Sequence, residues 1–202
     1  ICVAYDGMEK FFPAKKIKLT GNPIRKQVID IEGKIAEAQA FFGLAAQKKT
    51  ILIVGGSLGA QSINQAILNN IDQWNQMNAQ VIWQTGKTGY KDISAKVLPL
   101  KMEHIKVHEF IQRMDLAYAA ADLIVSRAGA IAISEISAVG KTVIFVPYPH
   151  AAEDHQTKKA QRLAHDTLYN GEMLQAMAVE IKKFGITNAD DIIAQEVIKL
   201  IK

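Results

Sequence analysis

The stretch "DLIVSRAGAIAISEISAVGKTVIFVPYPH", residues 122–150, decides the fold class because it holds a strand, a tight turn and a helix in direct succession. Its first apolar run stops at Ser126-Arg127-Ala128-Gly129. The second apolar stretch repeats at helical spacing and ends at Gly140, a residue typical of helix ends. Another buried strand pattern follows at once. Strands joined through one helix form the repeating unit of a parallel sheet covered by helices.

Short apolar runs alternate with amphipathic segments along the rest of the chain. Six runs rich in Ile and Val are candidate strands: Ile17–Thr20, Ile51–Val54, Gln80–Gln84, Ile105–His108, Asp122–Ser126 and Thr142–Val146. A helical pattern runs from Ile63 to Trp74, and a final helix is expected after Asn188, a candidate cap. This alternation predicts an α/β fold with a Rossmann-like parallel sheet and helices on both faces.

Composition excludes several classes of protein. The 202 residues are 49% hydrophobic and 22% charged, as in an ordinary globular domain. No apolar run reaches the roughly 18 residues of a membrane-spanning helix, and the single Cys2 excludes an internal disulfide framework. The net charge is only +4 and the basic residues are scattered, so no nucleic acid partner is expected. An anionic membrane surface and a phosphate ligand fit this charge equally well.

The segment "ILIVGGSLGAQS", residues 51–62, predicts a buried strand, a glycine turn and a helix start. Its glycines, Gly55, Gly56 and Gly59, allow close approach of a ligand, and Ser57 adds a hydroxyl group. Free N–H groups at a helix start favour a phosphate. The dinucleotide fingerprint fails because Val54 stands where its first Gly belongs. A phosphate site and a bare strand-to-helix turn remain equally good readings of this motif alone.

The stretch 122–150 offers a second candidate anion-binding site. Arg127 and Gly129 precede the helix, whose first residues, Ala130, Ile131 and Ala132, would present backbone N–H groups. Glu135 follows within two turns on a helix that is apolar nearly all round. A carboxylate in such surroundings predicts a partner, for instance the vicinal hydroxyls of a ribose, over the alternative of a solvated surface residue.

Other candidate motifs are weaker. Both Gly-Lys-Thr tripeptides, at residues 86–88 and 140–142, lack the Gly that a P-loop requires five residues earlier. Two His and two acids crowd residues 150–155, but their spacing matches no metal-site template, so no metal is predicted. Arg25 follows a Gly-Asn-Pro turn, where it could pair with a phosphate or simply occupy a surface turn.

Five motifs in order, "TGNPIR", "GGSLGA", "HEFIQRM", "DLIVSRAGAIAISEI" and "PYPHAAEDHQTKKA", resemble the MurG family of peptidoglycan glycosyltransferases. The resemblance covers about residues 1–163 and the last helix, and it implies the donor-binding half of a two-domain GT-B fold. The family transfers N-acetylglucosamine from UDP-N-acetylglucosamine to the undecaprenyl-pyrophosphoryl-N-acetylmuramyl-pentapeptide lipid, with inversion and without a metal or another cofactor. The alternatives are another UDP-sugar enzyme such as an epimerase, or a non-catalytic nucleotide-sugar-binding module.

The resemblance also implies roles for individual residues. The glycine turn would face the diphosphate, the backbone of Ile111 would read the uracil, Glu135 would hold the ribose hydroxyls and Gln156 would contact the sugar. The full predicted substrate-binding set is Arg25, Gly56, Ser57, Gly59, Ile111, Arg127, Gly129, Ala130, Ile131, Ala132, Glu135 and Gln156. No catalytic base is identified, because the family's acceptor site lies in the other half of the protein.

The resemblance further predicts the organisation of the chain. Residues 1–20 are expected to be the end of an amino-terminal domain and a linker, 21–185 the donor-binding domain, and 186–202 a helix packing back toward the amino-terminal domain. The chain opens without Met in a strand pattern, so we expect a longer polypeptide with the lipid-acceptor site. The expected location is peripheral, on the inner face of the bacterial cytoplasmic membrane. Residues are expected to be missing from the sequence near Ala164–Gly171, where a strand-helix unit of the family has no counterpart.

Overall fold

The computed structural model describes residues 1–146 and 167–201, and its centre is a five-stranded parallel sheet. The strands are β3 (Lys49–Val54), β4 (Ala79–Gln84), β5 (Ile105–His108), β6 (Leu123–Arg127) and β7 (Val143–Val146). Their spatial order is β5-β4-β3-β6-β7, and every neighbouring pair is parallel. This is the strand order of a Rossmann-like sheet, so the predicted fold class is confirmed.

Helices cover both faces of the sheet because successive strand residues point to opposite sides. On one face Ile51 and Ile53 pack under α3 (Gln61–Asn69), α4 (Ile71–Gln76) and α5 (Tyr90–Val97), around the fully buried Trp83. On the other face Leu52 and Val54 pack under four helices: α1 (Lys26–Ile29), α2 (Ile35–Phe42), α6 (Met114–Ala120) and α7 (Ala130–Val139). The sheet is therefore buried on both sides, as its near-continuous apolar strands require.

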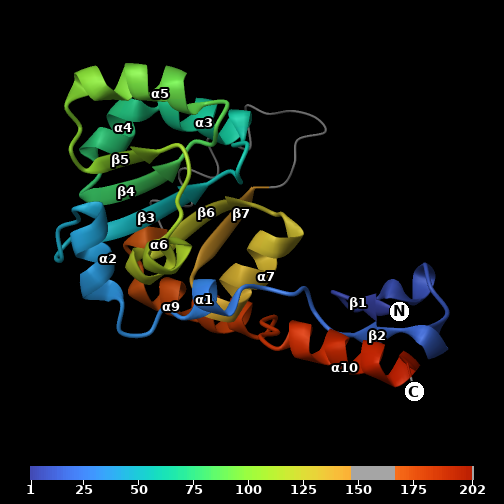
Figure 1. The fold of residues 1–202 in the computed structure, drawn as a ribbon. Coiled ribbons are helices and arrows are strands. Elements are labelled where there is room, and N and C mark those ends of the chain that lie inside the picture. The colour runs from blue at the N-terminus through green and yellow to red at the C-terminus, as the bar shows by residue number, and fades with distance from the viewer. Residues whose placement is uncertain (147–166, 202) are drawn as a thin grey trace.

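A smaller part of the molecule lies beside this sheet (Figure 1). It contains a separate parallel pair, β1 (Cys2–Val3) and β2 (Lys18–Leu19), and the short 3₁₀ helices η1 (Met8–Lys10) and η2 (Ala14–Lys16). The last helix, α10 (Ala189–Ile201), runs along this pair, and both chain termini lie at the same end of the molecule (Figure 1). Ion pairs from Lys18 to Glu196 and from Lys26 to Asp191 hold α10 in place, at 3.8 and 3.2 Å.

Most predicted elements are present, with three differences. The candidate strand 17–20 belongs to the small sheet, because Gly21, with a φ of +77°, turns the chain away toward α1 directly afterwards. The helical pattern from Ile63 to Trp74 is two helices, α3 and α4, which are separated at Asn70. Sequence patterns did not predict four of the α-helices, α1, α2, α5 and α6, or the 3₁₀ helices η1, η2 and η3 (Leu98–Leu100).

The carboxyl-terminal region is helical in the part that the structure describes. The chain continues into α9 (Gly171–Lys182), whose first turn is capped by the Asn170 side chain accepting from the Met173 N–H. The final helix begins directly after Asn188, as predicted. None of the described helices combines the length and apolar character that crossing a membrane requires.

Candidate functional site

The candidate site lies at the carboxyl edge of the sheet, between β3 and β6. The chain order of the strands reverses at this point, because β4 lies on one side of β3 while β6 lies on the other. Ligands of open α/β sheets bind in the crevice outside such a switch point. The turn at residues 55–60 leaves β3 here, and residues 128–129 leave β6 next to it. The two motifs that were predicted from the sequence as candidate anion-binding sites are thus neighbours.

The glycine turn after β3 is open on its outer side and tightly packed on its inner side. Gly56 and Gly59 have φ values of +87° and +88°, a region that favours glycine. A Cβ on Gly59 would lie 2.1 Å from the Thr85 carbonyl oxygen, so only glycine fits there. Gly56 and Ser57 are exposed, and a Cβ on Gly56 would meet nothing within 4 Å. The backbone of this turn is therefore accessible to a ligand.

The second candidate anion-binding site is the start of α7. Gly129 is the N-terminal cap residue in an extended conformation, and no side chain caps the helix. Its first residues Ala130 and Ile131 are exposed, so the uncapped N–H groups and the positive end of the helix dipole are accessible to an anion at this edge of the sheet. Arg127, the last residue of β6, donates to the Ser62 hydroxyl of α3. This bond places a guanidinium group between the two candidate anion-binding sites.

Glu135 lies one turn further into α7 and is buried, with 7% of its surface exposed. The Tyr118 hydroxyl of α6 donates to its Oε2 at 3.2 Å, and Arg25 Nη2 lies 3.9 Å from its Oε1. Burial raises the pKa of Glu135, while the Tyr118 bond and the Arg25 charge act in the opposite direction. A carboxylate accepts about four hydrogen bonds. Its two protein partners therefore leave capacity for a ligand that donates from two groups.

Ile111 lies in the loop between β5 and α6, at the same edge of the sheet. Its side chain is buried, and its backbone N–H donates to the Gln84 side chain at 2.8 Å. The neighbouring Phe110 is 55% exposed. The Ile111 backbone was expected to read the base through its N–H and C=O groups. Its N–H group is bound to Gln84 within the protein.

The structure brings eleven of the twelve predicted site residues to this edge, and the twelfth, Gln156, lies outside the described residues. The acid- and His-rich segment 150–155 also lies outside them. Among residues 1–146 and 167–201, no cluster of three or more His, Cys, Asp or Glu could hold a metal ion. Sequence reasoning missed Tyr118 and Gln84. The signal for Tyr118 was a phenol within a helix of small apolar residues, since a buried hydroxyl needs a partner.

Residues 50–183 match the family model described as the glycosyltransferase family 28 C-terminal domain. A relative from Parabacteroides distasonis is 54% identical over 165 residues, which are 82% of this chain and 45% of the relative. One from Flavobacterium psychrophilum is 44% identical and covers 100% of this chain and 60% of the relative. Both are named UDP-N-acetylglucosamine--N-acetylmuramyl-(pentapeptide) pyrophosphoryl-undecaprenol N-acetylglucosamine transferase. The chain spans about half the length of these curated relatives.

The Flavobacterium alignment is 226 residues long and includes all 202 residues of this chain, so the relative carries extra residues within the matched region. The segment Ala164–Gly171, where residues were expected to be missing, lies partly outside the described residues, so this expectation stays a prediction.

Solved structures show the same architecture. The crystal structure of Acinetobacter baumannii MurG has a TM-score of 0.71 and 26% identity, and the match covers 98% of this chain and 59% of that one. The UDP-GlcNAc 2-epimerase from Neisseria meningitidis, solved bound to UDP-GlcNAc, has a TM-score of 0.65 and 18% identity over 95% of this chain and 58% of that one. The epimerase is similar in fold alone. Half of a GT-B glycosyltransferase fold is thus confirmed as the architecture of this chain.

Proposed function

The chain belongs to the glycosyltransferase family 28 C-terminal domain family, and on this premise we propose that it binds the UDP-N-acetylglucosamine donor of a MurG-type glycosyltransferase. The observation that carries the proposal is the meeting of three groups at one sheet edge. These are the open glycine turn, the uncapped start of α7, and the buried Glu135 with its unused acceptor capacity. Together they match a diphosphate flanked by a ribose.

Each part of the site has a defined chemical role in this proposal. The N–H groups of the glycine turn and of Ala130–Ala132 bind the diphosphate and stabilise the charge that develops on it as the leaving group. Arg25, whose side chain is 68% exposed and lies 3.9 Å from Glu135, adds a positive charge beside the diphosphate. Glu135 accepts hydrogen bonds from both ribose hydroxyls, and the loop of Ile111 contacts the uracil. Gln156 contacts the sugar, and neither a metal nor another cofactor takes part.

The activity of the whole protein is part of the same proposal. The acceptor hydroxyl of the undecaprenyl-pyrophosphoryl-N-acetylmuramyl-pentapeptide lipid displaces UDP directly at the anomeric carbon, which inverts its configuration. The polypeptide contacts the inner face of the cytoplasmic membrane peripherally through its other half. Residues 1–20 and 186–202 form the junction with that half, and residues 21–185 form the donor domain. The position of α10 beside β1 and β2 supports this division (Figure 1).

Two assays test the proposal. Calorimetric titration of the 202-residue chain with UDP and with UDP-N-acetylglucosamine should show binding, and absence of binding would refute the donor-site assignment. A radiolabelled-donor assay should show no transfer to a lipid acceptor analogue by this chain, but transfer by the full-length protein. The reason is that positioning both substrates across two domains contributes up to about 7–11 kcal/mol of barrier reduction. Release of an epimerised sugar by the full-length protein would favour the epimerase instead.

A further inference from the structure

The segment at the end of β4, Gln84-Thr85-Gly86-Lys87-Thr88, has so far entered the site only through the bond between Gln84 and the Ile111 N–H. We call it the β4 exit segment. It contains a Gly-Lys-Thr sequence without the spacing of a P-loop. In the structure it lies between the glycine turn after β3 and the loop 109–113 after β5, because β4 pairs with both strands. It therefore separates the proposed diphosphate side of the site from the proposed base side.

The β4 exit segment is fastened to the glycine turn by three hydrogen bonds. They run from Gln84 Nε2 to Gly56 O (3.0 Å), from Lys87 N to Ser57 O (3.3 Å) and from Thr88 Oγ1 to Leu58 O (2.7 Å). The backbones also touch, since a Cβ on Gly86 would lie 2.1 Å from the Gly59 nitrogen. Three consecutive carbonyl groups of the turn, those of Gly56, Ser57 and Leu58, thus accept hydrogen bonds from the β4 exit segment. Within the turn, the Gly59 N–H donates to the Gly56 carbonyl at 3.1 Å. The segment therefore fixes the backbone of the turn from its inner side.

Four further hydrogen bonds fasten the same segment to the base side. Thr85 donates twice to His108 O, from its N–H (2.9 Å) and its hydroxyl (3.2 Å), Gly86 N donates to Glu109 O (3.1 Å), and Ile111 N donates to Gln84 Oε1 (2.8 Å). Within the β4 exit segment, only the Gln84 side chain bonds to both loops. It is 5% exposed, and both ends of its amide are used. A shift of either loop would therefore leave a buried amide group without a partner, which is costly.

We propose that Gln84 is a positioning residue that couples the diphosphate-binding turn to the base-reading loop and thereby sets the preference for a uracil nucleotide. The proposal rests on the proposed donor site. Through its amide, the position of the Ile111 backbone depends on the position of Gly56, so base and diphosphate are bound as one unit. With the Ile111 N–H held by Gln84, the base meets a fixed loop. A fixed loop discriminates uracil from cytosine better than a mobile one. When the wrong base binds, a fixed loop cannot rearrange, so its polar groups are left without hydrogen-bond partners and binding is weaker.

The chain provides a matched control on the same strand. Gln80 is also a buried glutamine of β4, 4% exposed, and it points to the same side of the sheet as Gln84. Its amide bonds to a loop as well: Ala45 N donates to Oε1 at 2.9 Å and Nε2 donates to Ala45 O at 3.0 Å. Gln80 lies at the opposite edge of the sheet, away from the site. Replacement of either residue removes similar bonds, but only one replacement affects the two site loops.

The experiment compares Gln84→Met with Gln80→Met in the 202-residue chain. Both variants should lose stability in chemical denaturation. Only Gln84→Met should bind UDP at least about tenfold more weakly and lose most of the UDP-over-CDP preference of the unaltered chain, because its loops move independently. Equal UDP affinity in Gln84→Met and the unaltered chain, or an equal loss in Gln80→Met, would overturn the proposal. Failure of the unaltered chain to bind UDP would instead refute the donor site itself.

A second variant, Gln84→Glu, keeps the test decisive if the methionine variant does not fold. Its carboxylate retains an acceptor for the Ile111 N–H but has no donor for the Gly56 carbonyl. We therefore expect weaker UDP binding with the UDP-over-CDP preference retained, since the base loop is still held. Retention of full UDP affinity in this variant would show that the bond to Gly56 has no part in binding and would overturn the coupling.

Discussion

Two buried carboxylates on neighbouring helices of one sheet face are held in opposite ways. Asp115, in the first turn of α6, is 8% exposed, and Glu135 of α7 is 7% exposed. Arg113 donates to both oxygens of Asp115, at 2.9 and 2.8 Å, and Lys34 donates to it at 3.2 Å. Glu135 has one tyrosine hydroxyl and a more distant, exposed arginine. The two carboxylates are thus equally buried, but the negative charge of Asp115 is balanced by two close cations, whereas that of Glu135 is not.

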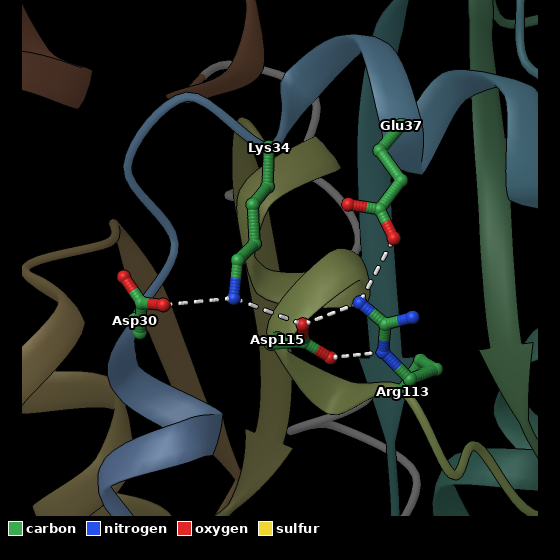
Figure 2. Close-up of polar contacts among 5 residues, drawn as sticks. All are labelled: Asp30, Lys34, Glu37, Arg113 and Asp115. Carbon is green, nitrogen blue, oxygen red and sulfur yellow. Dashed lines mark hydrogen bonds and ion pairs between the residues drawn. The ribbon is translucent and has the colours of Figure 1, made fainter.

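The surroundings of Asp115 form a closed network, which Figure 2 shows. Lys34 also pairs with Asp30 at 3.1 Å, and Arg113 pairs with Glu37 at 3.0 Å, so the network joins α2 to the loop before α6. Mainly through the Arg113 hydrogen bonds, the pKa of Asp115 falls to about 2, although burial opposes this. Burial instead raises the pKa of Glu135. We infer that Asp115 stabilises the fold, whereas Glu135 lowers stability and gains its full set of partners from a ligand.

The largest expected effect is that of Glu135→Gln on nucleotide binding. The amide keeps the shape but removes the charge that strengthens hydrogen bonds from the ribose hydroxyls. UDP affinity should therefore fall by about 1–3 kcal/mol, measured by calorimetry on both proteins. The stability of this variant at neutral pH should stay equal or rise. A carboxyl whose pKa is raised on folding contributes stability below its unfolded pKa and loses it as pH rises through the folded value.

This prediction fails if the two proteins bind UDP equally, which would remove Glu135 from the ribose site. It also fails in its second part if Glu135→Gln is clearly less stable than the unaltered chain at neutral pH. In that case Glu135 would resemble Asp115, and the contrast between the two carboxylates would not hold.

The next effect is that of Asp115→Asn on stability. The amide cannot accept charge-assisted bonds on both oxygens from Arg113, so the free energy of unfolding at pH 7 should fall by about 1–2 kcal/mol, allowing for the partial exposure of Arg113. A carboxyl whose pKa is lowered contributes stability above its unfolded value. The difference between the proteins should thus shrink as pH falls from the ordinary 3.8 toward about 2. Urea denaturation across this range measures it.

Asp115→Asn also serves as the control for the ribose site. Its UDP affinity should change far less than that of Glu135→Gln, because Asp115 has all its partners within the protein. A loss of UDP binding as large as that of Glu135→Gln, in a variant that remains folded, would show that the network in Figure 2 acts on the site and not only on stability.

The sequence predicted the frame of this site better than its connections. The strands were predictable because fully buried parallel strands are continuous apolar runs, and the predicted Ile105–His108 coincides with β5. Glu135 was predictable as a polar exception on an apolar helix. Its pairing with Tyr118 was not, since the two residues lie 17 positions apart on different helices and no local pattern joins them. The same holds for Gln84, whose two bonds reach residues 28 and 27 positions away. Such pairings depend on how strands and helices pack.

The smallest expected effect is that of Tyr118→Phe, which removes only the hydroxyl that donates to Glu135. Burial raises the pKa of Tyr118 well above its usual value, so this hydroxyl keeps its proton and remains a donor. Its loss should weaken UDP binding by about 0.5–1.5 kcal/mol, because one oriented hydrogen bond to the carboxylate disappears. The ring stays in place, so the fold should be retained.

The pH dependence of UDP affinity separates orientation of Glu135 from simple packing. Binding requires the ionised carboxylate, so affinity should fall as pH is lowered through the pKa of Glu135, which lies above its ordinary 4.5. The Tyr118 bond lowers that pKa, so in Tyr118→Phe the fall should begin at a higher pH than in the unaltered chain. The UDP phosphates also titrate, and they do so in every variant. Glu135→Gln has no carboxylate to titrate, so its pH profile provides the baseline for the phosphates alone.

Identical pH profiles for Tyr118→Phe and the unaltered chain would mean that the hydroxyl does not act through Glu135. Tyr118 would then be a packing residue, and the carboxylate would be oriented by α7 and Arg25 alone.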